Sequence, residues 1–162
     1  MPLRIGNQTR RSSISTSASE VSLAQFGMVV ITIGNRGGHP DRSKWYHNYS
    51  YGLTSPENVS FRDYGLADKK MAVEQLAHRF SFIDIDKVGI WGHSGGGFAT
   101  AAAMFRYPDF FKVGISESGN HDNRNYEDDW GERYQGLLVR SNGTDNYAEE
   151  ANQTHAKNLK GK

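Results

Sequence analysis

The sequence contains no cysteine, so disulfide bonds and thiolate metal ligands play no part in its chemistry. No apolar run approaches the roughly 20 residues that a membrane-spanning helix needs. Excess charge is also missing, because 19 Lys and Arg against 18 Asp and Glu give a formal net charge of +1, with both signs interspersed. The composition therefore gives no electrostatic reason to expect a nucleic-acid partner or an anionic membrane surface.

The order of apolar segments indicates the fold class. The chain has 162 residues, which suits one domain with its own core. Residues 28–33, 87–91 and 112–118 are strongly apolar, which is typical of strands buried on both faces of a parallel sheet. Residues 63–80 and 96–107, which alternate with these strands, have helical patterns. In the first of these helices, Met71 is expected in the apolar stripe and Lys69 on the wet face. We therefore predict an α/β fold of parallel strands joined by helices.

The remaining segments are mostly polar. A short helix is predicted from Glu20 to a stop at Gly27, and Asp63 is the predicted cap of the helix that follows it. Residues 1–19 are rich in Ser and Thr and predict a loop or arm, and residues 34–63 form a long connection. Residues 139–162 predict a polar tail with little regular structure beyond a short helix.

Four glycines surround one serine in the stretch GHSGGG, residues 92–97. The pattern G-x-S-x-G lies between a predicted strand and a predicted helix, which is the context of a nucleophile elbow. In such a turn the backbone is strained, the Ser94 hydroxyl stands above the sheet, and neighbouring residues have no room for side chains. The N–H of Gly95 would then point to where an oxyanion forms. The alternative is a phosphate-cradling turn, but the spacing matches neither G-x-G-x-x-G nor a Walker A loop.

The motifs taken together resemble the prolyl oligopeptidase family, and within it the dipeptidyl peptidase IV branch. The resemblance rests on MVVITIGNRGG, on the helix near Asp63, on the approach DKVGIWGHSGG to the serine, and on ERYQGL at residues 132–137. It spans roughly residues 20–138. It implies a partial α/β-hydrolase catalytic domain covering residues 1–162, a peptide substrate, and no metal or other cofactor.

The resemblance also assigns roles to residues. It implies that Ser94 is the nucleophile and that Gly95 supplies an oxyanion-hole N–H, although dipeptidyl peptidases often have tyrosine at the position of Gly95. Trp130 and Tyr134 match aromatics that line the proline-accepting S1 pocket. Ordinary core packing is the alternative for these two residues.

The family's catalytic acid and histidine are expected beyond Lys162, and its second oxyanion donor before residue 1. We therefore predict that the isolated chain is inactive. A triad of Ser94, Asp122 and His155 has the right order, but no strand precedes His155 to hold it. The other histidines lack metal-ligand spacing such as H-E-x-x-H.

The resemblance further places a strand encoded before residue 1 between residues 28–33 and 87–91. The sheet is thus expected to be incomplete, with a central gap. Either the three strands repack, or another chain fills the gap, as in a homodimer, or the residues are a piece of a longer protein whose β-propeller and remaining hydrolase strands are missing here. Two other functions remain open: an esterase or acylaminoacyl-peptidase-like hydrolase, and a non-catalytic interaction module. The compartment is open, and only the resemblance favours a periplasmic or exported bacterial protein.

Overall fold

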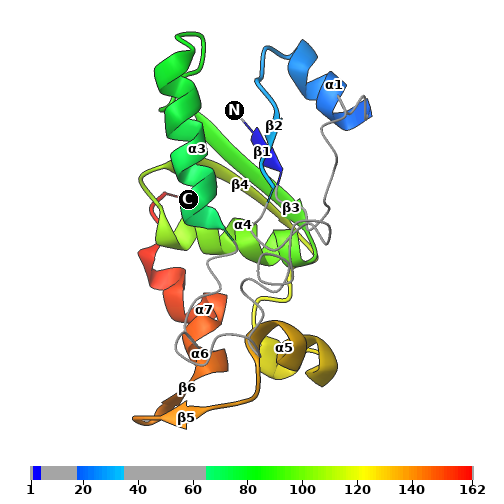
Figure 1. Ribbon diagram of the computed structural model, residues 1–162, viewed down its shortest axis with the longest axis vertical. Coiled ribbons are helices and arrows are strands. Elements are labelled where there is room, and N and C mark those ends of the chain that lie inside the picture. Colours follow the sequence, from blue (N-terminus) through cyan, green and yellow to red (C-terminus); the bar gives the residue numbers. More distant parts are fainter. Residues whose placement is uncertain (1, 5–17, 35–64, 162) are drawn as a thin grey trace, which may run out of the picture.

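A parallel β-sheet with helices packed on it forms the centre of the molecule (Figure 1). The computed structural model describes residues 2–4, 18–34 and 65–161. Its main sheet has the order β2-β1-β3-β4, formed by β1 (Pro2–Arg4), β2 (Ile31–Thr32), β3 (Val88–His93) and β4 (Phe111–Glu117). All three pairings are parallel, which confirms the predicted α/β class.

The centre of this sheet corrects one prediction. Residues 1–19 were expected to be an arm, and the place between residues 28–33 and 87–91 was expected to be empty. Instead β1 fills it, with Leu3 opposite both Ile31 and Ile90. Only backbone groups are needed to complete a ladder, so three residues suffice, and a segment that short has no periodicity to reveal it.

The outer strands are more exposed than predicted. The regular part of the strand predicted at residues 28–33 is Ile31–Thr32, and Thr32 is exposed at this side of the sheet. At the other side, β4 pairs only with β3 among the described strands. Val113 and Ile115 are 59% and 65% exposed, so neither strand is buried on both faces. The sheet is therefore incomplete, as predicted, but at its margin and not at its centre.

Two helices cover the buried face of the sheet (Figure 1). They are α3 (Leu66–Arg79) and α4 (Gly95–Arg106). On β3 the buried side chains Val88 and Ile90 alternate with less buried ones, as expected for a strand with one face on the core. The core cluster consists of Leu66, Val73, Val88, Ile90, Phe98, Ala99, Ala102, Ala103 and Phe111. The alanines of α4 keep this helix close to the strands.

The orientation of α3 differs in detail from the sequence prediction. Lys69, expected on the wet face, is only 1% exposed, and its Nζ lies 3.5 Å from the carbonyl oxygen of Gly65. Met71, expected in the apolar stripe, is 57% exposed. Lysine is strongly polar only at its tip, so its long stem can cover apolar surface where a hydropathy pattern predicts exposure. The predicted cap Asp63 lies outside the described residues, and Gly65 precedes the helix in a left-handed conformation.

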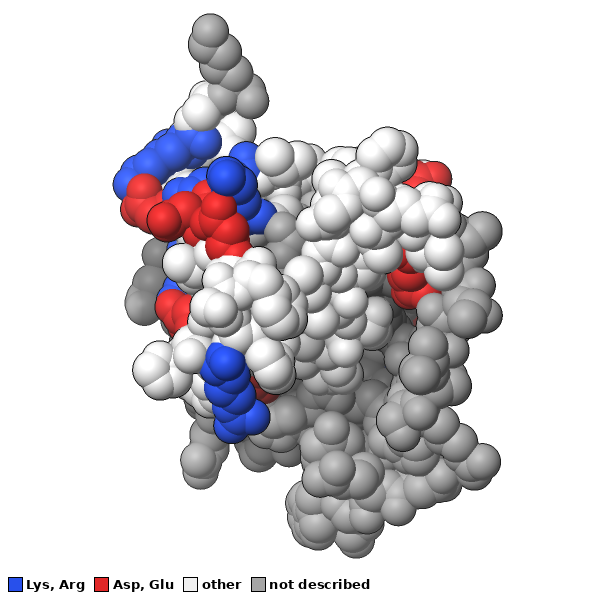
Figure 2. Space-filling model, turned by 90° about the horizontal axis from the view of Figure 1, so that it is seen from above, with Lys and Arg blue, Asp and Glu red and all other residues white. Residues whose placement is uncertain are grey.

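The helix predicted near Glu20 is confirmed as α1 (Ala18–Gln25). The helix ends at Gln25, and Gly27, two residues later, has the left-handed φ of +77° that was predicted for the stop. Among the described residues, no helix has both the length and the apolar character needed to cross a bilayer. Seen from above, the Lys and Arg side chains lie on one side together with some Asp and Glu, further acidic side chains lie on the opposite side, and much of the described surface between them is uncharged (Figure 2).

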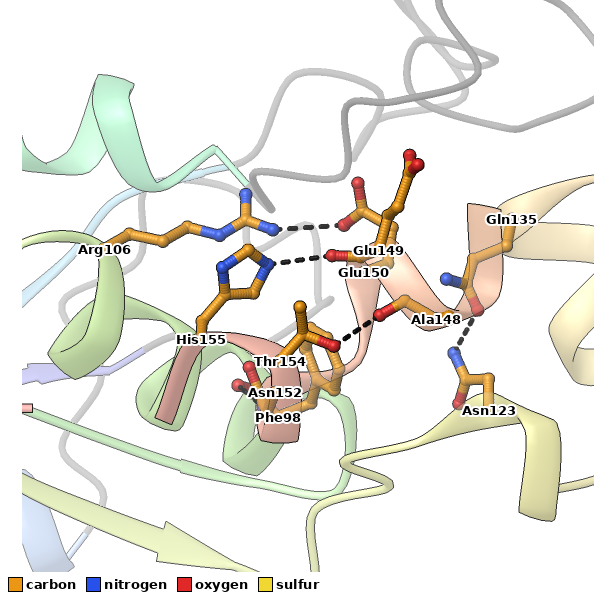
Figure 3. A network of polar contacts seen from close by, with 10 residues as sticks. All are labelled: Phe98, Arg106, Asn123, Gln135, Ala148, Glu149, Glu150, Asn152, Thr154 and His155. Carbon is orange, nitrogen blue, oxygen red and sulfur yellow. Dashed lines mark hydrogen bonds and ion pairs between the residues drawn. The ribbon is translucent and has the colours of Figure 1, made fainter. Parts of the chain in front are cut away.

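The C-terminal region is more ordered than the predicted polar tail. It contains a hairpin of β5 (Arg140–Ser141) and β6 (Thr144–Asp145), then α6 (Asn146–Glu150), α7 (Asn152–His155) and the 3-10 turn η2 (Ala156–Asn158). Figure 3 shows how polar contacts fix it: Arg106 of α4 pairs with the buried Glu150 at 3.1 Å. The polar residues of this segment led to the prediction of a weakly structured tail. In the fold, the buried ones among them have hydrogen-bond or ion-pair partners.

Candidate active site

Ser94 occupies the turn between β3 and α4 in a strained backbone conformation. Its φ and ψ are +55° and −121°, a region that L-residues rarely adopt. Two backbone hydrogen bonds hold it there: the Ser94 N–H donates to the Glu117 carbonyl at 2.9 Å, and the Phe98 N–H donates to the Ser94 carbonyl at 3.0 Å. This is the strand-turn-helix geometry of a nucleophile elbow.

The glycines around Ser94 serve different purposes. A Cβ on Gly92 would overlap the backbone of Gly96, and a Cβ on Gly97 would overlap the carbonyl oxygen of Glu117. Both positions therefore require glycine for the turn to close. A Cβ on Gly95 would meet only Trp130, whose Cζ2 would be 3.9 Å away. Gly95 is thus spatially free to carry a side chain, and its missing side chain leaves space beside the serine.

The Ser94 side chain is exposed, and no residue of the described part of the chain bonds to its hydroxyl. The Gly95 N–H belongs to the first turn of α4, whose N–H groups have no carbonyl partner within the helix and carry the positive end of its dipole. An exposed hydroxyl beside such donors can attack a carbonyl whose oxygen then accepts their hydrogen bonds. His93, next to Ser94, instead points to Glu117, with 3.5 Å between Nδ1 and Oε2.

An aromatic row borders the serine. Trp130 and Tyr134 lie on α5 (Asp128–Gln135), with ring centroids 4.6 Å apart. Tyr126 packs edge-on against Trp130 at 5.6 Å. The sequence analysis missed Tyr126, although a spacing of four residues from 126 to 130 to 134 is a recognisable signal for side chains on one helical face. Because Trp130 is the side chain that a Cβ on Gly95 would meet, this aromatic row lies next to the elbow.

The internal triad is not assembled. The Asp122 carboxylate accepts a bidentate pair of hydrogen bonds from Arg124, at 2.9 Å from Nε and 2.6 Å from Nη2. These bonds lower the pKa of the Asp122 carboxyl. His155 contacts the backbone carbonyl of Glu149 through Nε2 at 2.8 Å (Figure 3). Each group thus has a local partner, and in the described part of the chain neither is hydrogen-bonded to Ser94. Among the described residues, no cluster of three or more His, Asp or Glu side chains is arranged to hold a metal ion.

His121 lies behind the elbow in a network that the sequence did not reveal. Its Nδ1 is 2.9 Å from Nδ2 of the buried Asn152, and its Nε2 is 3.5 Å from Oγ of Ser116. Its ring stacks on Phe98 of α4 with 6.4 Å between centroids. Partial burial lowers the pKa of His121 below the ordinary value of 6.5, because desolvation disfavours the charged imidazolium.

Comparison with known proteins finds similarity over most of the chain. Residues 14–162 match the model of the prolyl oligopeptidase family. Human dipeptidyl peptidase 8 is 34% identical over 95 residues, which are 59% of this chain and 10% of that protein. Bovine dipeptidyl peptidase 4 is 29% identical over 93 residues, or 57% of this chain and 12% of that protein.

A solved structure from Bacteroides ovatus, assigned as a dipeptidyl aminopeptidase IV, superposes with a TM-score of 0.78 at 25% identity. The superposition covers 99% of this chain and 22% of the other. The chain therefore spans about a tenth of the curated relatives' length and less than a quarter of this structure.

The unequal space around the elbow glycines can be tested by paired substitutions. Gly97→Ala is expected to destabilise the fold by about 1–3 kcal/mol, because its Cβ overlaps the Glu117 carbonyl oxygen and forces the turn apart. Gly95→Ala is the matched control and should change stability by less than about 1 kcal/mol. Urea unfolding followed by circular dichroism gives both values, and equal losses would contradict the assigned packing.

The environment of His121 predicts a pH dependence of stability. Since its pKa is lowered in the folded state, the unfolded chain takes up the proton first as the pH falls. The stabilisation is therefore complete above pH 6.5 and declines as the pH drops from there towards the lower pKa of the folded protein. His121→Asn should flatten this part of a urea-midpoint profile, and the exposed His78→Asn should leave it unchanged. An unaltered slope in His121→Asn would show that another group is responsible.

Proposed function

The chain belongs to the prolyl oligopeptidase family, and from this premise we propose that Ser94 is the nucleophile of a serine peptidase of the dipeptidyl peptidase type. The observation that supports this most is the strained Ser94 backbone at the strand-to-helix turn, with an exposed hydroxyl and the first N–H groups of α4 beside it. Strain of this kind is retained where function needs the geometry.

The proposed reaction proceeds through an acyl-enzyme. A base removes the proton of Ser94 Oγ as this oxygen attacks the peptide carbonyl, and a tetrahedral intermediate forms with its negative charge on the former carbonyl oxygen. The Gly95 N–H donates to that oxygen. The C–N bond then breaks, and the leaving amine receives the proton from the base. In the second half of the reaction the base takes a proton from water as the water attacks the ester carbonyl, the bond to Ser94 Oγ breaks, and this oxygen receives the proton.

The base and its acidic partner are proposed to come from sequence outside residues 1–162. Within the described part, Asp122 is bound to Arg124 and His155 to a backbone carbonyl, so neither serves Ser94. A serine hydroxyl without a base within hydrogen-bond reach is a weak nucleophile. We therefore propose that the 162-residue chain alone is inactive and that the intact, longer enzyme is active.

The aromatic row is proposed as the wall of the S1 pocket. Trp130 borders the space beside Gly95, and the rings of Tyr134 and Tyr126 both pack against it. A flat apolar surface next to the nucleophile suits the ring of proline, because the ring buries apolar area against the indole without needing a polar partner. Proline at the P1 position is accordingly the proposed preference.

Hydrolysis of two reporters by the intact enzyme tests this function. A dipeptide reporter ending in proline should be cleaved faster than a short acyl ester, and Ser94→Ala should reduce turnover of both by about four to six orders of magnitude. Trp130→Ala should lower kcat/KM for the proline reporter by about 10- to 100-fold, because the apolar contact with the P1 ring is lost.

The exposed Phe82→Ala supplies the matched control, as an aromatic truncation remote from the proposed pocket in sequence. A faster reaction with the acyl ester than with the proline reporter would favour the esterase reading. Equal losses on both substrates in Trp130→Ala would contradict the assignment of Trp130 to the S1 pocket.

A further inference from the structure

We propose that His121 is a positioning residue for the elbow: as a neutral imidazole protonated on Nε2, it fixes the first turn of α4 and so aims the Gly95 N–H at the reacting carbonyl. The inference rests on the proposed function of Ser94 and Gly95. It arises from three contacts of the His121 ring, with Asn152, Ser116 and Phe98.

The tautomer follows from the partners of Asn152. The amide nitrogen of this residue lies 3.0 Å from the carbonyl oxygen of Phe98 and 2.9 Å from His121 Nδ1. An amide nitrogen can only donate, and turning the amide over would place two oxygens against each other at Phe98. His121 Nδ1 must therefore be the acceptor. A neutral imidazole that accepts at Nδ1 carries its proton on Nε2.

The proton on Nε2 continues the network to a second carbonyl. It faces Ser116 Oγ at 3.5 Å, the outer limit of a hydrogen bond, and Ser116 donates its own hydrogen to the Gly97 carbonyl at 2.9 Å. Two consecutive carbonyls of the first turn of α4, those of Gly97 and Phe98, thus receive side-chain donors that His121 orders. Carbonyls this early in a helix bond to backbone N–H groups as well, so the side chains add to the helix's own bonds.

The imidazole has little freedom to move. A Cβ on Gly119 would lie 2.7 Å from His121 Cε1, so the backbone at this position lies directly against the ring. The backbone is tied to the same partner as the ring, because Asn152 N–H donates to the His121 carbonyl at 2.9 Å. Loss of the imidazole would therefore free both Asn152 and the turn that follows β4.

The first turn of α4 connects this network to the reacting groups. Phe98 N–H donates to the Ser94 carbonyl at 3.0 Å, and Ser94 N–H donates to the carbonyl of Glu117, the residue after Ser116. Gly95 lies between Ser94 and Gly97 in the same turn. A displacement of this turn by a fraction of an ångström would redirect the Gly95 N–H, and misplacements near 1 Å cost about 100-fold in rate.

Among the described residues, no charged group of the elements around His121 is free to stabilise its protonated form. In α4 the sole charged residue, Arg106, pairs with Glu150. In β4, Lys112 donates to the Asp109 carbonyl and Glu117 faces His93. In α7, His155 contacts the Glu149 carbonyl. Asp122, the residue that follows His121, is bound to Arg124. The imidazole therefore acts in its neutral form, consistent with its lowered pKa.

Two substitutions of His121 separate a positioning role from a purely structural one. Asn offers a neutral oxygen near the place of Nδ1, whereas Leu fills space without an acceptor. In the intact enzyme, His121→Leu should lower kcat for the proline dipeptide reporter by about 10- to 100-fold, with KM within about twofold. His121→Asn should retain kcat within about threefold, and the exposed His78→Leu should match the wild type.

The folded state of each variant is confirmed by its circular dichroism at the assay temperature. If His121→Leu does not fold, Asn152→Ala replaces it, since removing the donor should cause the same fall in kcat. An unchanged kcat in a folded His121→Leu or Asn152→Ala, or a His121→Asn as slow as the Leu variant, would overturn the inference. A wild-type enzyme without peptidase activity would instead overturn the proposed function, and the positioning role with it.

Discussion

The close approach of the first turn of α4 to the ends of β3 and β4 is the constraint on which the rest of the structure depends. It is possible because Gly92 and Gly97 have no side chains where any Cβ would overlap backbone. The approach forces Ser94 to φ +55° and at the same time places the Glu117 carbonyl where it accepts the Ser94 N–H. Strain in one residue is thus balanced by a hydrogen bond from the neighbouring strand, which is how an unfavourable backbone conformation persists in a stable fold.

Segments distant in the sequence reinforce this constraint. The chain after β4 brings His121 against Phe98, and α7 brings Asn152 to both of them. Arg106 and Glu150 fix the other end of α4 to α6. The polar C-terminal region therefore stabilises α4, the helix that begins at the elbow. Its buried Asn and Glu side chains are tolerated because each has a partner.

The sequence predicted the parts whose cause is local. The elbow, the helix after it and the parallel strands follow from glycine spacing and apolar runs, and Gly27 has the left-handed φ expected of a residue that follows a helix. The filled sheet centre, the burial of Lys69 and the ordered C-terminal region were not predicted, because backbone pairing and side-chain partners from distant segments determine them. His121 was missed for the same reason, because only its contact with Asn152 distinguishes it from other loop residues, whereas Tyr126 could have been found from its four-residue spacing to Trp130.

We propose that the strained elbow makes Ser94 a nucleophile once the intact enzyme supplies a base. The most direct measurement treats the intact enzyme and the 162-residue chain in parallel with a fluorophosphonate, and locates the adduct by mass spectrometry of the peptides. We expect an adduct on Ser94 in the intact enzyme, and none on the folded shorter chain. An adduct on another serine, or no adduct in an enzyme that cleaves peptides, would contradict it.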